Sequence, residues 1–294
     1  LGYFLNHHGM LKGEATIANL PQSDRGPARV WYGSAAASEY HDMDWLRQHL
    51  SPNEDVQLKS LTNDLTILVL AGPNARKVLS ACSRGDWSKD AFPWLSLREC
   101  FIGIAPATVM GVSFSGELAY EIHIPNASLY AAYLAIQEAG LEFNIKLFGA
   151  RAVDSMRLEK GFLHWKTDIL TEFDPFETGL NKFVKINKNE FIGKEALNFR
   201  QSKECLNKLI TLEINKKNAP AQGGATLSIK NKVIGTITSG DWGHRINKNI
   251  AYAFIKSEYS SIGSEVFVDM LGEKISAKII ESCPYDPNFD IIKS

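Results

Sequence analysis

The chain has 294 residues, of which 45% are hydrophobic, and this is enough for a large buried core and two or three domains. Its 32 basic and 33 acidic side chains give a formal net charge of −1, so neither nucleic acid nor an anionic membrane is expected as a partner. No apolar stretch approaches the roughly 20 residues that a membrane-spanning helix needs.

The positions of cysteines and histidines indicate which cellular compartment is expected and whether a metal site is expected. The four cysteines are widely spaced and form no C-x-x-C pair, which predicts a reduced, cytoplasmic protein. The seven histidines show no zinc-binding spacing. His7, His8 and His41 are better explained as surface or loop residues, so no metal site is expected.

The first two thirds of the chain predict strands mixed with helices. Expected strands lie at 27–33, at 64–73 and twice within 107–125, and expected helices cover 34–50, 73–82, 126–140 and 149–162. The strand at 64–73 is apolar throughout and is expected to be buried on both faces. Asn126 is the expected cap of its helix, and Asp174 and Glu177 form a capping box. Strict βαβ alternation is missing, which favours an α+β fold.

The sequence pattern changes after about residue 205, where short expected strands alternate with Gly and Asn turns. The expected strands occupy 208–214, 225–229, 232–240, 249–255, 265–271 and 274–280. This pattern predicts a C-terminal all-β domain, either a barrel or a jelly-roll-like fold. The absence of G-x-G-x-x-G, P-loop and G-x-S-x-G motifs argues against nucleotide binding and serine hydrolysis.

A set of short stretches, taken together, resembles one family. They are GMLKGEATI, GSAAASEYHDMDWL, LAGPNARKVL, FPWLSLRE, VSFSGELAYEIHIP, MRLEKGFLHWKTDI, DPFETGL, FIGKEAL and IGTITSGDWG, in order along nearly the whole chain. They resemble the aminomethyltransferase family, which contains the T-protein of the glycine cleavage system. Two of them, GSAAASEYHDMDWL and RLEKGFLHW, are more similar to the folate-binding C-terminal half of dimethylglycine and sarcosine dehydrogenases.

The resemblance implies a cloverleaf of three domains around a central tetrahydrofolate site. The expected domains are a discontinuous folate-binding domain of residues 1–52 and 141–200, a second α+β domain of residues 53–140, and the β domain of residues 201–294. The implied activity is one-carbon transfer from a small methylated amine, of the dimethylglycine or sarcosine kind, to give 5,10-methylenetetrahydrofolate.

Flavin chemistry is expected outside this chain. In the fused dehydrogenases an N-terminal flavin domain first oxidises the amine to an iminium, so FAD is expected only in a missing N-terminal domain or a flavoprotein partner. Family members also carry sequence ahead of the GMLKGEATI position that this chain lacks. An N-terminally truncated chain is therefore expected.

Five residues are expected around the folate, four of them from the resemblance. Glu121, in GELAYE, corresponds to the carboxylate that accepts parallel hydrogen bonds from the pterin edge. Phe114 and Trp165 match aromatic residues near the folate, Arg157 is implied to help position it, and Trp242 is a large residue in a Gly-flanked loop that could close over it. Structural alternatives remain open: a solvent-facing strand carboxylate for Glu121, core packing for Phe114, an i,i+3 ion pair with Asp154 for Arg157, and loop anchoring for Trp242.

Glu14 matches the family position of an aspartate near the reacting folate nitrogen. A carboxylate there stabilises a cationic iminium and handles the proton that is released on attack. Glutamate is one methylene longer, and a shift of ~1 Å can lower a rate ~100-fold. The structural alternative is an exposed strand carboxylate. Lys166 is another departure, because the relatives carry glycine there.

Two other functions remain open from the sequence. One is a stand-alone T-protein that acts on a lipoyl-bound aminomethyl group, although the neutral charge of the chain does not favour docking to a carrier protein. The other is a folate-binding module that has lost transfer chemistry, which the glutamate at position 14 favours.

Overall fold

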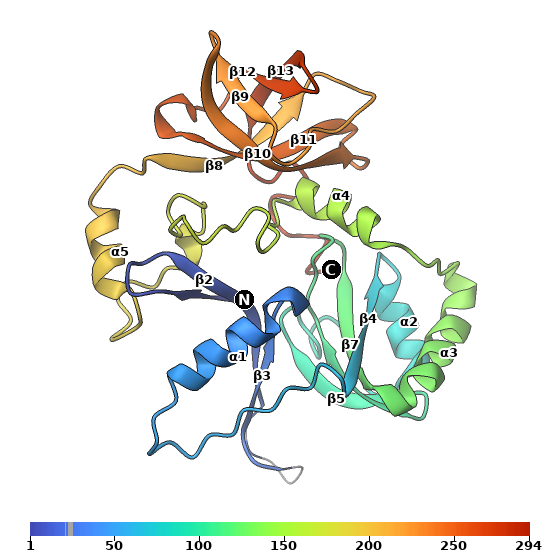
Figure 1. The fold of residues 1–294 in the computed structure, drawn as a ribbon. Helices are drawn as coiled ribbons and strands as arrows, with labels where there is room; N and C mark the ends of the chain where they lie inside the picture. Colours follow the sequence, from blue (N-terminus) through green and yellow to red (C-terminus); the bar gives the residue numbers. More distant parts are fainter. Residues whose placement is uncertain (21, 23–25) are drawn as a thin grey trace. The chain divides into compact units, whose positions relative to one another are not determined.

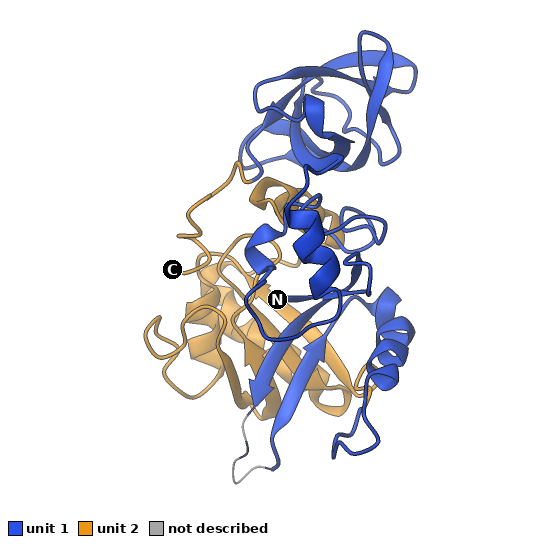
Figure 2. Cartoon of the chain, turned by 90° about the vertical axis from the view of Figure 1, so that its left-hand side faces the viewer, with its two compact units in different colours: residues 1–58, 163–282 blue, residues 59–162, 283–294 orange. Residues whose placement is uncertain are grey.

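The computed structural model describes residues 1–20, 22 and 26–294 and combines helices with antiparallel sheets (Figure 1). The chain forms two compact units (Figure 2). Unit 1 comprises residues 1–58 and 163–282, and unit 2 comprises residues 59–162 and 283–294. The α+β class is confirmed, and the division into three domains stays a prediction.

The N-terminal part of unit 1 is a three-stranded antiparallel sheet of β1 (Gly2–Leu5), β2 (Leu11–Leu20) and β3 (Arg29–Gly33). In β2 the buried residues Leu11, Gly13 and Ala15 alternate with half-buried ones, so Glu14 faces the side opposite to these three. A 3-10 turn, η1 (Ala36–Ser38), leads into α1 (Glu39–Gln48), so the regular helix begins later than the predicted residue 34.

The C-terminal strands of unit 1 close into a barrel with the order β10-β11-β8-β13-β12-β9. The strands are β8 (Asn207–Ile214), β9 (Thr226–Ile229), β10 (Lys232–Gly243), β11 (Lys248–Lys256), β12 (Glu265–Met270) and β13 (Glu273–Ile280), with η5 (Ser257–Tyr259) after β11. All six predicted strands are confirmed, and closure removes the free edges that a sheet would otherwise expose. The jelly-roll alternative is thereby excluded.

The β10–β11 pairing corrects the expectation for Trp242. Strand β10 continues past the predicted residue 240 to Gly243, and Trp242 lies opposite Asn249. Trp242 is therefore a strand residue, and its expected place in a Gly-flanked loop is wrong. The sequence signal misled because the glycines that suggested a loop are compatible with a strand whose neighbours approach closely.

Unit 2 is built on a four-stranded antiparallel sheet with the order β4-β7-β6-β5. Its strands are β4 (Leu65–Ala71), β5 (Leu97–Ile102), β6 (Ala105–Met110) and β7 (Ala119–Pro125), and α2 (Ala75–Cys82) and α3 (Leu129–Gly140) pack on one face (Figure 1). The apolar core between that face and the two helices includes Leu79, Ile122 and Ile136.

Strand β4 corrects a second expectation. It lies at the edge of the sheet, and Ile67 and Val69 are 49% and 48% exposed, so the strand is not buried on both faces. A continuous apolar run cannot distinguish a central strand from an edge strand whose second face lacks a covering helix. The register sets Ile67 beside His123 and Val69 beside Glu121.

The remaining elements include α4 (Ala150–Lys160), α5 (Lys194–Gln201), η2 (Asn126–Ser128), η3 (Leu141–Phe143) and η4 (Asn181–Phe183). Asn126 does not cap α3, because its side chain bonds to the Asn63 carbonyl and the Thr66 hydroxyl. The two hydrogen bonds of the predicted capping box are present, because Asp174 Oδ1 accepts the Glu177 amide at 2.9 Å and Glu177 Oε2 accepts the Asp174 amide at 3.4 Å. They stabilise a turn at 175–179 and not the expected helix.

Candidate functional site

Glu121 lies on β7 with its side chain directed to the face opposite α2 and α3. Its neighbours Tyr120 and Ile122 point into the core, so strand alternation fixes its direction. The side chain is 33% exposed, and Glu121 Oε2 lies 3.4 Å from Nε2 of His123, which shares its face. The carboxylate is thus partly open to a ligand, as the bidentate role requires.

Phe114 lies in the connection between β6 and β7, two residues before Gly116, whose φ of +82° is in the region that favours glycine. The Phe114 ring is exposed and parallel to the Phe162 ring, with centroids 6.5 Å apart. Phe289 approaches Phe162 with centroids 6.0 Å apart. The connection therefore presents Phe114 at the edge of an aromatic cluster rather than in the core of unit 2.

Arg157 supports this cluster from α4. Its buried guanidinium donates from Nε to Asp154 Oδ1 at 3.2 Å and from Nη1 to the Phe162 carbonyl at 3.3 Å. The i,i+3 ion pair that the sequence suggested is present. A direct role of Arg157 in folate binding stays a prediction, while its contact with the Phe162 backbone connects it to the ring beside Phe114.

Glu14 lies on β2 directly opposite Tyr3 of β1, and the Tyr3 hydroxyl donates to Glu14 Oε1 at 3.1 Å. Burial raises the pKa of Glu14 to about 7 and outweighs the hydrogen bond from Tyr3, which lowers it. Glu14 is half-buried, so the alternative of an exposed strand carboxylate is excluded. Glu14 can therefore gain or lose a proton near neutral pH, as a general base must.

Trp165 is buried in the apolar cluster of unit 1 that also contains Leu11, Ile169 and Leu180, with Tyr3 packed against it. Its indole N–H donates to the Ser38 hydroxyl at 2.6 Å. The following residue, Lys166, has a φ of +65°, which explains why a glycine is suited to this position. Stacking of Trp165 on the folate stays a prediction.

Asp168, which the sequence analysis did not single out, joins the Trp165 loop to the barrel. It is buried, and its Oδ1 accepts the hydroxyls of Thr238 at 2.5 Å and Ser239 at 2.6 Å on β10. Its Oδ2 accepts the His164 amide at 3.0 Å. The residue lies within the KTDI stretch, but its two partners on β10 are 70 and 71 positions away, so the sequence around Asp168 does not reveal them.

The predicted residues divide between the units. Glu14, Trp165 and Trp242 belong to unit 1, whereas Glu121, Phe114 and Arg157 belong to unit 2. Tyr3 links Glu14 to the Trp165 cluster, and Phe162 links Phe114 to Arg157. Tyr3, Phe162, His123 and Phe289 were missed by sequence reasoning, because contacts across a hairpin or between distant segments leave no periodic pattern.

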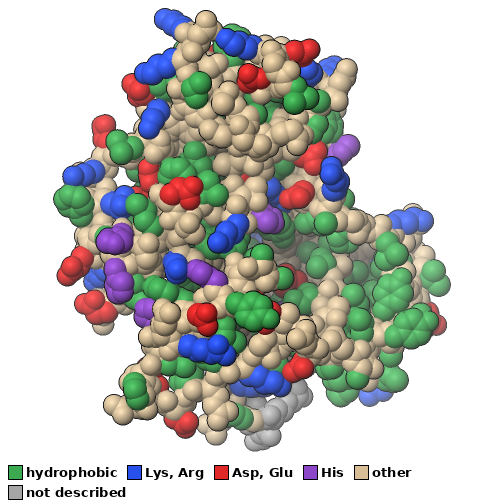
Figure 3. Space-filling view, in the orientation of Figure 1, with side chains coloured by type: hydrophobic (Ala, Val, Ile, Leu, Met, Phe, Trp, Pro, Cys, Tyr) green, Lys and Arg blue, Asp and Glu red, His purple; other side chains and the backbone are tan. Residues whose placement is uncertain are grey.

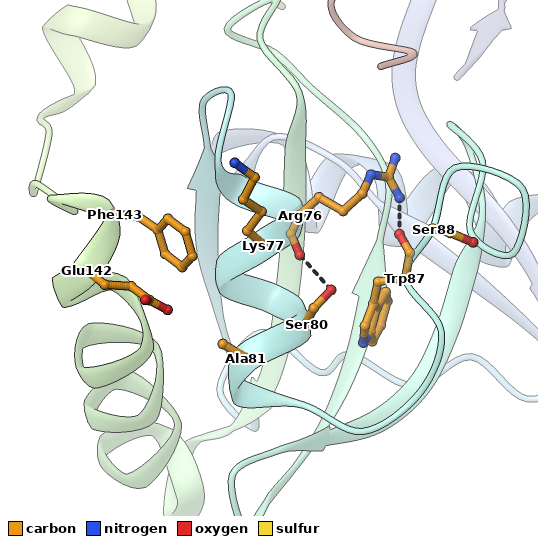
Figure 4. A pocket seen from close by; sticks show the side chains of 8 residues that line it. All are labelled: Arg76, Lys77, Ser80, Ala81, Trp87, Ser88, Glu142 and Phe143. Atoms are coloured by element: carbon orange, nitrogen blue, oxygen red, sulfur yellow. Dashed lines mark hydrogen bonds between the residues drawn. The ribbon is translucent and has the colours of Figure 1, made fainter.

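A pocket of about 490 Å³ lies elsewhere, on the outer side of α2 in unit 2 (Figure 4). Its lining includes Arg76, Lys77, Trp87 and Phe143, and none of the predicted site residues. Arg76 already donates to the carbonyl of Trp87. This pocket therefore does not serve as the predicted folate site.

Basic and acidic side chains are interspersed on the face shown in Figure 3. Within the described residues, no group of three or more His, Cys, Asp and Glu side chains could hold a metal ion. The same part of the chain contains no helix long and apolar enough to cross a membrane.

The mixed fold with its closed C-terminal barrel is that of a solved aminomethyltransferase. The crystal structure of the glycine cleavage system aminomethyltransferase T from Bartonella henselae superposes with a TM-score of 0.83 over 97% of this chain and 75% of that one, at 22% identity. The family profile for the GCVT N-terminal domain matches residues 1–188, and that for the glycine cleavage T-protein C-terminal barrel domain matches residues 207–286. The chain belongs to the glycine cleavage T-protein (aminomethyltransferase) family.

Relatives of two kinds align with the chain. Human mitochondrial dimethylglycine dehydrogenase is 34% identical over 95% of this chain and 32% of its own length. Human mitochondrial sarcosine dehydrogenase is 28% identical over 98% of this chain and 33% of its own length. An aminomethyltransferase from Desulfitobacterium hafniense is 30% identical over 85% of this chain and 67% of its own length. The chain thus spans about a third of the length of the dehydrogenases.

Proposed function

We propose that this chain binds tetrahydrofolate and transfers to it a one-carbon unit from the iminium form of a small methylated amine, of the dimethylglycine or sarcosine kind. The observation that carries the proposal is a pair of carboxylates with contrasting environments at the positions that the resemblance assigned. Glu121 is partly exposed on a sheet face, and Glu14 is half-buried with its pKa raised by burial to about 7. A carboxylate in an open, polar environment stays ionised and can bind a ligand, whereas burial raises the pKa of a carboxylate so that it can transfer a proton near neutral pH.

The residues of the chain suit a reduced folate. An ionised Glu121 has two oxygens for the adjacent N–H donors of a pterin edge. The exposed Phe114 ring offers a flat apolar surface beside a heterocycle. Arg157 holds the backbone of Phe162, and this keeps the aromatic cluster next to Phe114 in place.

Bound tetrahydrofolate supplies two nitrogens, N5 and N10, to which the transferred carbon becomes bonded. Glu14 in its anionic form stabilises the positive charge on the donor carbon and accepts a proton released as a nitrogen–carbon bond forms. It then returns this proton to the departing amine. Both N–H protons finally reside on the amine, which leaves as an ammonium ion, so charge and atoms balance without an oxidant at this step.

The oxidation that generates the iminium is assigned to a flavoprotein, either a domain or a partner. The names of two relatives, dimethylglycine dehydrogenase and sarcosine dehydrogenase, support this assignment. The four cysteines are free, which is consistent with a reducing compartment. Both dehydrogenases are named as mitochondrial proteins, so the predicted cytoplasmic location competes with a mitochondrial one.

The transfer is tested by generating the iminium with a flavoprotein dimethylglycine dehydrogenase in the presence of tetrahydrofolate and a formaldehyde trap. Adding the chain is expected to increase 5,10-methylenetetrahydrofolate despite the trap, and Glu14→Gln is expected to lose the increase. A yield that is the same with and without the chain would contradict the proposal. Product formed only with a lipoyl-bound aminomethyl donor would instead identify a stand-alone T-protein.

A further inference from the structure

The hydrogen bond between Tyr3 and Glu14 is built into the β1–β2 hairpin. The two residues lie directly opposite each other in the antiparallel register, and the Tyr3 hydroxyl donates to Glu14 Oε1 at 3.1 Å. Directly opposite side chains on one sheet face are the pairs that interact most closely in a sheet. The contact therefore follows from backbone pairing, and does not depend on a flexible loop.

The Tyr3 ring is held by packing on its other side. It meets the Phe183 ring edge to face, with centroids 5.0 Å apart, and packs against the cluster that contains Leu11 and Trp165. Rings in such contacts have little freedom to turn, so the hydroxyl keeps one direction. Tyr3 thus reaches Glu14 from a fixed position.

Other charged or titratable groups near the hairpin are occupied elsewhere or act more weakly on Glu14. These groups are Lys12, Lys182, Asp42 and the amino group of Leu1. The two lysine ammonium groups each lie 5.2 Å from a ring centroid, of Trp45 and of Phe183 respectively. Asp42 Oδ1 lies against Gly13, on the face of β2 opposite to the Glu14 side chain. The Leu1 amino group lowers the pKa of Glu14 less than the hydrogen bond from Tyr3 does.

Tyr3 remains a donor over the whole working range of pH. Burial, and then the charge of Glu14, raise the pKa of Tyr3 far above its ordinary value, so its hydroxyl keeps its proton. Glu14 Oε1 is consequently always presented with an O–H group. Oε2 has no hydrogen-bond partner among the described residues, which leaves one oxygen for a reacting group.

We propose that Tyr3 is a positioning residue for Glu14: its hydroxyl pins Oε1, so that the longer side chain of glutamate presents Oε2 in one orientation. The inference rests on the proposed function, in which Glu14 stabilises the donor carbon and handles the proton. A glutamate has one more rotatable bond than an aspartate, and a fixed hydrogen bond removes that freedom. Tyr3 also favours the anionic form that the transfer needs, because it donates to the carboxylate.

Tyr3→Phe tests the inference, since it keeps the ring and removes only the hydroxyl. The ionisation of Glu14 is followed by NMR on protein labelled with ¹³C at glutamate side-chain carboxyls, and Glu14→Gln assigns the signal. Loss of a hydrogen bond to a charged group is expected to lower the acid dissociation constant of Glu14 about tenfold, so its pKa rises above about 7. The matched control is Tyr32→Phe, in the same sheet, whose hydroxyl bonds to Asp42 and whose loss leaves the Glu14 titration unchanged.

The transfer reaction gives a second readout. In Tyr3→Phe the acidic limb of the pH profile of kcat is expected to move to higher pH by the same amount, with the KM for folate unchanged. An unshifted Glu14 titration overturns the inference whether or not the chain binds folate. A shifted titration in a chain that does not bind tetrahydrofolate removes the proposed function and leaves the Tyr3–Glu14 coupling in place, so the two failures are distinguishable.

Discussion

The raised pKa of Glu14 makes the stability of the folded chain depend on pH. Between the ordinary value of 4.5 and the folded value of about 7, the folded chain holds a proton that the unfolded chain has released. Because the folded state binds more protons there, the free energy of unfolding falls as pH rises through this window, by about 3 kcal/mol at most.

Glu14→Gln removes this dependence, since glutamine does not ionise. The variant and the parent are expected to be similarly stable near pH 5, and the variant more stable by up to about 3 kcal/mol near pH 8. Urea unfolding at the two pH values measures the difference, in which the titrations of all other groups cancel. A difference that stays constant with pH would show that burial does not perturb Glu14.

Single residues also mark the limit of what the sequence predicts. The direction of Glu121 follows from alternation with Tyr120 and Ile122, and the structure agrees. Tyr3 was missed because a register irregularity between Phe4 and Leu5 changes the pairing of the hairpin, so counting along the strands does not reveal its partner.

At the scale of elements, the C-terminal segment of unit 2 is held by a buried ion pair. Lys160 Nζ of α4 lies 2.8 Å from Asp286 Oδ2, and the two side chains are 0% and 7% exposed. Asp286→Ala leaves the ammonium buried without its carboxylate, and is expected to lower the free energy of unfolding by about 3–5 kcal/mol. Chemical denaturation measures the change.

An exposed pair provides the control for that experiment. Lys248 Nζ lies 2.7 Å from Glu213 Oε2 in the barrel, and the two side chains are 43% and 37% exposed. Glu213→Ala is expected to change stability by less than about 1 kcal/mol. Equal effects at the two sites would contradict the view that burial makes the Lys160–Asp286 pair important.

The barrel depends on a close approach between β10 and β11 at Gly235. A Cβ added there would lie 2.2 Å from the Phe254 carbonyl oxygen, which is backbone and cannot rotate away. Gly235→Ala is therefore expected to lower the free energy of unfolding by at least about 2 kcal/mol. In Gly33→Ala, the nearest atom to the added carbon is 3.9 Å away, so thermal unfolding of this control is expected to be nearly unchanged.

Element boundaries were predictable where local patterns decide them, as in the six barrel strands and in α4. They were not predictable where long-range pairing decides. Trp242 belongs to a strand because Asn249 pairs with it, and β4 lies at an edge because of the order in which distant strands assemble. Neither the strand conformation of Trp242 nor the edge position of β4 can be predicted from the residues of the segment itself.

At the scale of the whole molecule, composition and motif order indicated the α+β class and the barrel, and the family profiles now cover residues 1–188 and 207–286. The grouping of the N-terminal sheet with the barrel in unit 1 could not be foreseen, because it arises from contacts between residues 1–58 and residues 163–282, which lie far apart in the sequence. The chain spans about a third of the length of the dehydrogenase relatives.

The central claim is that this chain binds reduced folate through Glu121. Isothermal titration calorimetry with tetrahydrofolate under nitrogen tests it most directly, with Glu121→Ala beside the parent and Glu99→Ala as a control from the same face of the same sheet. The account predicts micromolar binding to the parent and to Glu99→Ala, and binding weakened about 100-fold or more in Glu121→Ala, since a bidentate charged pair is lost. No heat of binding with the parent chain, or equal binding by Glu121→Ala, would contradict the account.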